Sequence, residues 1–160
     1  MASNNSTNIV HLLENAIINM NVKGEYSINE QEISFIKKMI VESPEPFHNV
    51  SLQINDILNS KRIAISDIPE IIYIISNIYI SEFSYKNINI IDCIEFTLDT
   101  LIDSGILHVD NNTEEVLKSI VHYSLNLLKT TIPVIEKEVE IVTVSCFKRI
   151  KKCMNNSCCK

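Results

Sequence analysis

The scarcity of glycine limits the folds that this chain can adopt more than any other feature. Its 160 residues include two glycines, Gly24 and Gly105, and four prolines. An all-β protein needs a turn every ~8–12 residues, and turns rely heavily on these residue types, so the composition argues against a sheet-dominated fold. Phosphate-cradling loops need several glycines close together, because backbone N–H groups must approach the anion. The sequence therefore also argues against a P-loop or a dinucleotide-binding fold.

Length and hydrophobic content are those of a single domain. A chain of 160 residues with 46% hydrophobic residues can fill one core. Isoleucine and asparagine are heavily used, as expected where codons are AT-rich, and Ile71 to Ile75 form an almost unbroken isoleucine run. Such β-branched runs overstate the preference for strands, so the prediction of secondary structure depends on periodicity instead.

Apolar residues recur at helical spacing in seven segments, most of which begin with a start signal. Ser27 and Glu30 have the spacing of a capping box, Ser43 precedes Pro44, and Asp67 precedes a helix start with proline. Helices are predicted at residues 8–20, 28–42, 44–59, 68–83, 89–103, 113–128 and 133–150. We therefore expect an all-α, single-domain bundle of about seven helices.

The last of these segments is ambiguous. Residues 139–144 contain β-branched pairs that could extend into a strand. Helix is favoured because one set of residues keeps helical spacing: Ile135, Val139, Val142, Cys146 and Ile150.

Charge divides the chain into two regions. Residues 1–147 hold all 20 acidic residues and nine basic ones, whereas residues 148–160 hold five basic residues and no acidic one. We expect an acidic helical domain over 1–147, with residues 1–7 disordered, followed by a basic, cysteine-rich tail over 148–160. Nucleic acid is not an expected partner of the body, because phosphate contacts need clustered lysine and arginine.

Targeting and membrane-spanning signals are not visible. The first eight residues lack both the positive and the apolar region of a signal peptide. No apolar stretch approaches the ~20 residues that span a bilayer, because polar side chains interrupt residues 68–83. We expect an intracellular, cytoplasmic protein that is not secreted, with its five cysteines reduced.

Residues 1–147 show no pattern typical of catalysis or of metal binding. The four histidines are scattered, and no serine occupies a nucleophile elbow. We expect His11 and His122 to be hydrogen-bonded boundary residues, Cys93 to be a buried thiol, and most carboxylates to face solvent or first helical turns. The joints between helices resemble each other in layout but lack the oxygen ligands of a calcium loop. We predict a protein that is not an enzyme, with no catalytic residue, metal or cofactor.

The tail carries the residues to which we assign a functional role. Thiols beside a polybasic run are the setting for S-acylation, where one acyl chain needs a second signal to hold a protein on a membrane. The lipidation candidates are Cys146, Cys153, Cys158 and Cys159. The candidates for binding an anionic surface are Lys148, Arg149, Lys151, Lys152 and Lys160.

Two alternatives remain open for the same segment. It could be a solvated, disordered basic tail that contacts an acidic partner or nothing. It could also bind zinc, although adjacent cysteines at 158 and 159 are awkward ligands for one ion.

A resemblance to a group of known proteins rests on two features of the sequence. These are its richness in isoleucine, asparagine and lysine and the run Ser66-Asp67-Ile68-Pro69-Glu70-Ile71-Ile72. Over residues 28–105 the chain is similar to small uncharacterised helical proteins of AT-rich large DNA viruses. The resemblance implies a component of the virion or of host interaction, and it transfers no functional residue.

We therefore predict a structural or adaptor protein that binds protein partners, itself included, with a tail that contacts a membrane or an acidic partner. The alternative is a regulator that accepts a partner's amphipathic helix in a groove, as the Bcl-2-like proteins of poxviruses do.

Overall fold

The computed structural model describes residues 8–23, 28–79 and 87–131. Over these ranges the chain forms six α-helices and one 3₁₀ helix, with no strand, which confirms the all-α class. The helices are α1 (Ile9–Lys23), α2 (Glu30–Glu42), α3 (Glu45–Ser60), η1 (Ile65–Asp67), α4 (Ile68–Ser76), α5 (Ile90–Asp103) and α6 (Glu114–Thr131). The segment 1–7, the predicted seventh helix over 133–150 and the tail over 148–160 lie outside the described residues.

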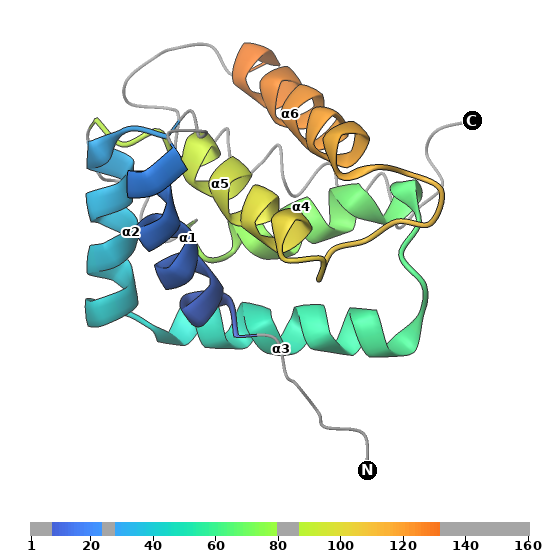
Figure 1. Cartoon of the computed structure of the whole chain (residues 1–160), viewed down its shortest axis with the longest axis horizontal. Helices are drawn as coiled ribbons and strands as arrows, with labels where there is room; N and C mark the ends of the chain where they lie inside the picture. Colours follow the sequence, from blue (N-terminus) through green and yellow to red (C-terminus); the bar gives the residue numbers. More distant parts are fainter. Residues whose placement is uncertain (1–7, 24–27, 80–86, 132–160) are drawn as a thin grey trace.

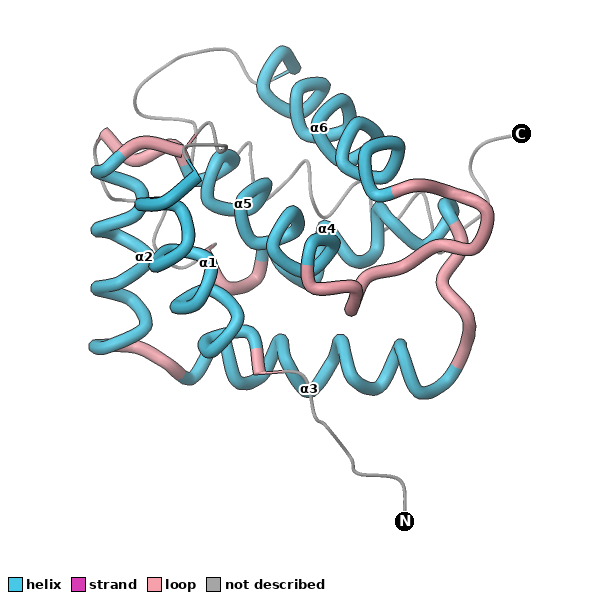
Figure 2. The backbone as a smooth tube through the Cα atoms, in the orientation of Figure 1, coloured by secondary structure: helices cyan, strands magenta, loops and turns pink. Residues whose placement is uncertain are grey.

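Helix α5 is the centre of the bundle. It contacts α1, α2, α4 and α6, and 11 of its 14 residues are buried. Figure 1 shows α6 lying across one side of α5, while α1 and α2 stand at one end and α3 runs along the opposite side. The tube in Figure 2 shows the same arrangement, with short loops joining the helices that it colours cyan. A helix so enclosed must be apolar around most of its circumference, as the sequence of α5 is.

Asparagine side chains cap α2 and α5, and each accepts two hydrogen bonds. The Oδ1 atom of Asn29 accepts from the N–H groups of Gln31 and Glu32, at 2.8 and 3.1 Å. Asn89 caps α5 in the same way through the N–H groups of its second and third residues. Each cap satisfies two donors that have no acceptor within their own helix.

The structure corrects two of the predicted helix starts, those of α2 and α3. The N-cap of α2 is Asn29 and not Ser27, so Glu30 is the first residue of the helix instead of the third. Ser43 ends α2, because its N–H donates to the carbonyl of Met39, and Pro44 precedes α3. At α2 two polar residues two positions apart were candidates for the cap, and at α3 the start differs from the prediction by one residue.

Helix α4 is shorter than predicted. It ends at Ser76 instead of residue 83, and the chain continues as a tight turn whose N–H groups donate three residues back. This turn buries both Ile78 and Tyr79 completely. The Tyr79 hydroxyl lies 2.7 Å from Thr97 Oγ1 on α5, and its ring meets Phe47 edge to face. The predicted start is confirmed, because α4 begins at Ile68 with Asp67 at the N-cap position and proline in its first turn. The Asp67 carboxylate makes no cap hydrogen bond to α4 and accepts instead from Ala64 N and Lys61 Nζ.

Contacts between helix ends fix how the helices meet. The N–H of Ile9, at the start of α1, donates to Ser51 Oγ on α3. The N–H of Asn89, the cap of α5, donates to Glu32 Oε1 on α2 at 3.1 Å. Gly105 follows α5 with a φ of +74°, a left-handed conformation that costs glycine little.

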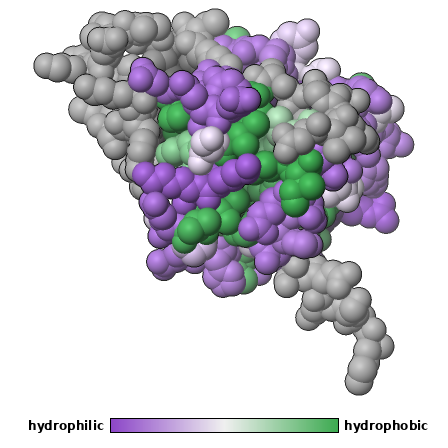
Figure 3. Space-filling model, turned by 60° about the vertical axis from the view of Figure 1, so that its left-hand side comes forward, coloured by the Kyte–Doolittle hydropathy of each residue, from purple (hydrophilic) through white to green (hydrophobic). Residues whose placement is uncertain are grey.

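The surface mixes polar and apolar side chains. Figure 3 turns the end with α1 and α2 forward and shows apolar patches among hydrophilic residues. Ile18 on α1 and Val41 on α2 are among the large apolar residues exposed on the molecule. None of the helices in the described ranges combines the length and the apolar run needed to cross a bilayer.

Candidate functional site

The sequence-predicted site residues in the tail all lie outside the described residues. They are Cys146, Cys153, Cys158, Cys159, Lys148, Arg149, Lys151, Lys152 and Lys160. Their roles in lipidation and anionic binding therefore stay predictions. Cys93, which was expected to be buried, is confirmed as such, and burial raises the pKa of its thiol far above the usual range.

The densest polar arrangement in the described part of the chain is a seam between α5 and α6. Glu95, Asp99 and Asp103 recur every four residues along α5. Lys118, His122 and Asn126 recur at the same spacing along α6. Residues four apart share a helix face, so two polar rows meet where the two helices pack. We call these six residues the α5–α6 seam.

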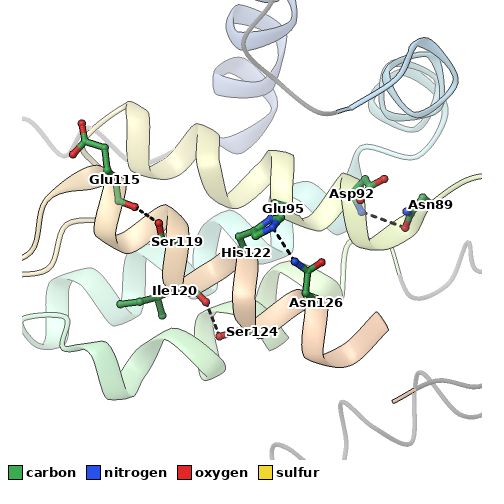
Figure 4. Close-up of polar contacts among 9 residues, drawn as sticks. All are labelled: Asn89, Asp92, Glu95, Glu115, Ser119, Ile120, His122, Ser124 and Asn126. Atoms are coloured by element: carbon green, nitrogen blue, oxygen red, sulfur yellow. Dashed lines mark hydrogen bonds and ion pairs between the residues drawn. The ribbon is translucent and has the colours of Figure 1, made fainter. Parts of the chain in front are cut away.

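His122 links the two helices within this seam. Its Nδ1 atom lies 2.5 Å from Glu95 Oε1, and its Nε2 atom lies 2.8 Å from Asn126 Nδ2. A carboxylate only accepts, so Nδ1–H donates to Glu95, and the Asn126 amide then donates to Nε2. Figure 4 shows the imidazole pointing from α6 toward Glu95 on α5. The prediction that His122 is a hydrogen-bonded boundary residue is confirmed.

Asp99 sits between the Lys118–Asp103 ion pair and the His122–Glu95 hydrogen bond of the seam. On one side Lys118 Nζ lies 2.5 Å from Asp103 Oδ1, and on the other His122 meets Glu95. Asp99 Oδ1 is buried and has no hydrogen-bond partner. Burial raises the pKa of Asp99 to about 7, and the neighbouring Glu95 and Asp103 also raise it, against the opposing charges of Lys118 and His122.

The sequence reading missed the burial of these carboxylates. Most carboxylates were expected to face solvent or first helical turns, yet Glu95 lies in the middle of α5 and is 9% exposed. Glu32 lies in the first turn of α2 and is 1% exposed. The seam was visible in principle, because acidic residues repeat at intervals of four on an otherwise apolar helix. Which neighbour that row would face depended on the packing of α6, which periodicity alone does not specify.

The seam brings the His122 imidazole together with carboxylates of α5. Half of the His122 side chain is exposed. A shallow depression elsewhere in the described structure is apolar, lined by Ile54, Ile57, Leu58, Ile71, Leu101, Ile106 and Leu107. Orienting a small molecule requires polar groups that converge on a cavity, and this lining provides none.

Metal ligands are likewise dispersed over the described ranges. His11 lies on α1, His48 on α3, His108 in the joint after α5, and His122 on α6. Within the described part of the chain, no three histidine, cysteine or carboxylate side chains are placed to share an ion. The Glu95–His122 hydrogen bond and the Asp103–Lys118 ion pair of the seam join α5 to α6.

Four basic side chains in the described ranges form ion pairs with acidic ones. The ion pairs are Lys38–Glu42 at 3.8 Å, Lys61–Asp67 at 2.6 Å, Arg62–Asp110 at 3.3 Å and Lys118–Asp103 at 2.5 Å. Each exposed pair contributes little to stability. Together they leave the described surface without a cluster of free positive charge.

Comparison of the chain with protein-family models, with curated proteins and with solved structures found no match.

Proposed function

We propose that the protein is a non-enzymatic structural or adaptor protein whose basic, cysteine-rich C-terminal segment contacts an anionic membrane surface. The observation that carries the proposal is the pairing of the body's basic residues. Four of them are engaged with carboxylates, and the body as a whole is acidic. Positive charge without an acidic counterpart is concentrated in residues 148–160, where five bases occur without an acid.

A membrane is favoured over a soluble acidic partner because thiols accompany the charges. A single acyl chain holds a protein on a bilayer only marginally, and a polybasic run supplies the second attraction. Residues 146–160 contain both ingredients within 15 positions. A place in a virion remains a prediction from the sequence resemblance.

The test compares two adjacent lysine pairs in otherwise intact chains. Lys151 and Lys152 are changed to glutamine in one variant, and Lys37 and Lys38 on α2 are changed in the other. Each basic residue near an anionic surface contributes about 1 kcal/mol, so loss of the tail pair should weaken binding about 30-fold. The measurement is flotation with vesicles that contain phosphatidylserine. Equal weakening by both variants, or binding unchanged by the tail variant, would refute the proposal.

Acylation is tested separately on protein from its native source. An intact mass should show added acyl groups that hydroxylamine removes, because thioesters are cleaved by it. Substitution of Cys146, Cys153, Cys158 and Cys159 by serine should abolish that added mass. Substitution of Cys93 is not a useful control, because its thiol lies in the core.

The alternative of a regulator that accepts a partner helix has one supporting observation. The apolar depression between α3, α4 and the joint after α5 could receive an apolar anchor of such a helix. Partner binding at that place would not need residues 146–160. Binding of a protein partner that survives removal of the tail charges would therefore favour this alternative.

A further inference from the structure

Helix α6 lies on the outside of the bundle. It packs mainly on α5, with a smaller contact to α4. Figure 1 shows it lying across one side of the molecule, joined to α5 by a loop. Its buried apolar residues Leu117, Val121 and Leu125 recur every four positions and so share one face of the helix. A helix held mainly by one face can separate from the body without unfolding the other helices.

The polar part of this contact is short of positive charge. From α5, three carboxylates face α6, those of Glu95, Asp99 and Asp103. From α6, Lys118 Nζ is paired with Asp103 at 2.5 Å, and the His122 imidazole is hydrogen-bonded to Glu95. Asp99 receives neither group, and its Oδ1 atom is buried without a hydrogen-bond partner.

Loss of the Asp99 proton adds a charge that the closed seam does not compensate. An ionised carboxylate oxygen that is buried without a donor or a counter-charge is strongly unfavourable. If Lys118 moved to Asp99 it would give up Asp103, so one carboxylate would stay unpaired. Among the described residues, the charged side chains that act on Asp99 come from α5 and α6 alone, although α1, α2 and α4 also pack on α5. Movement of α6 brings water to the Asp99 carboxylate instead.

We propose that α6 is released from α5 when Asp99 loses its proton, so that the docking of α6 is a proton-sensitive device built into the bundle. Burial raises the pKa of Asp99 from 3.8 to about 7, and Glu95 and Asp103 act in the same direction. Asp99 in the closed seam is therefore protonated at pH 5 and ionised at pH 8. Docking is fully favoured below the unfolded value of 3.8 and weakens as the pH rises through 7. The release does not depend on the membrane contact proposed above.

A thiol placed under α6 measures the release. Val121 is completely buried on the inward face of α6, so a reagent reaches the thiol of Val121→Cys only when the helix moves. The test uses the full-length chain with this change. The thiols of the C-terminal segment are removed by substituting serine for Cys146, Cys153, Cys158 and Cys159.

Cys93 in the same chain is the reference thiol. It is completely buried, and it lies about 200° around α5 from Glu95, so release of α6 alone leaves it covered. At pH 8 a pyridyl disulfide should react with the thiol at position 121 at least about tenfold faster than with Cys93. Equal rates for the two thiols would mean that the whole bundle opens, and the proposal would then be wrong.

The contribution of Asp99 is isolated by adding Asp99→Asn to this chain. Thiol reactivity itself depends on pH, and histidine also changes charge in this range. Both effects are common to the two chains at a given pH, so the ratio of their rates reports Asp99. The factor by which Asp99→Asn slows the reaction at position 121 should be about fivefold larger at pH 8 than at pH 5, after allowance for solvent screening. The same factor at both pH values would overturn the proposal.

Two further variants complete the test. Asp56→Asn is the matched control, because Asp56 is exposed on α3, and its effect on the rate at position 121 should be nearly the same at pH 5 and pH 8. A dependence on pH as large as that of Asp99→Asn would count against the seam as the cause. Leu125→Cys, which is also completely buried on α6, repeats the measurement where Val121→Cys disturbs folding. Circular dichroism at pH 5 establishes that each variant keeps its helices.

Discussion

The substitution Asp99→Asn should stabilise the protein, and by more at pH 8 than at pH 5. The pKa of Asp99 is raised from 3.8 to about 7 in the folded state, so the folded state holds a proton that the unfolded state has already released. Stability from this group is fully present below the unfolded pKa and is lost as pH rises through 7. Asparagine has the same shape and does not ionise, so it removes this loss.

The magnitude follows from the size of the shift. Each pH unit between the two pKa values changes the free energy of unfolding by about 1.4 kcal/mol, so the full shift corresponds to about 4 kcal/mol. Between pH 5 and pH 8 the ceiling is about 2–3 kcal/mol, because part of the loss has already occurred at pH 5. Asp99 is only partly buried, and solvent screening reduces the expected difference to about 1 kcal/mol.

Urea unfolding followed by circular dichroism at the two pH values measures this difference. Asp56→Asn is the matched control, because Asp56 is exposed on α3. Its effect should be nearly the same at pH 5 and pH 8. The reasoning about Asp99 is wrong if Asp99→Asn destabilises the protein equally at both pH values, since that pattern would mean an ionised, hydrogen-bonded carboxylate in the seam.

Two further predictions concern the core and a helix cap. Thr97 donates to the Cys93 carbonyl, so the buried Tyr79 hydroxyl donates to Thr97. Thr97→Val should therefore lower the free energy of unfolding by about 1–3 kcal/mol, because it leaves the Tyr79 donor unsatisfied. Tyr79→Phe should lower it by about 0.5–1.5 kcal/mol, because only an acceptor on Thr97 is left unpaired. Urea midpoints of the two variants compare them, and a larger loss for Tyr79→Phe would contradict the assignment of donor and acceptor. Asn29→Ala should lower the free energy of unfolding by about 1 kcal/mol, because two N–H groups at the start of α2 lose their acceptor. The same change at the exposed residue Asn59 should lower it by less. Equal losses at the two positions would mean that the cap contributes nothing.

Apolar spacing and helix start signals predicted the positions of the six described helices to within a few residues, apart from the end of α4. The burial of Cys93 was predicted as well. These features are local, because a helix face is defined by residues three and four apart whatever it later packs against. The errors were also local in cause: at the start of α2 two polar residues competed for one cap, and α4 closed early into a turn.

Only the tertiary structure decided what the polar residues of the core do. The sequence places Glu95, Asp99 and Asp103 on one face of α5, but it does not say that Lys118 and His122 meet them across the helix pair. The same holds for Tyr79 and Thr97, and for Glu32 and the cap of α5. Apolar burial is non-directional and can be read from spacing, whereas a hydrogen bond or an ion pair needs two particular groups within about 3 Å, which only the packing of whole helices provides.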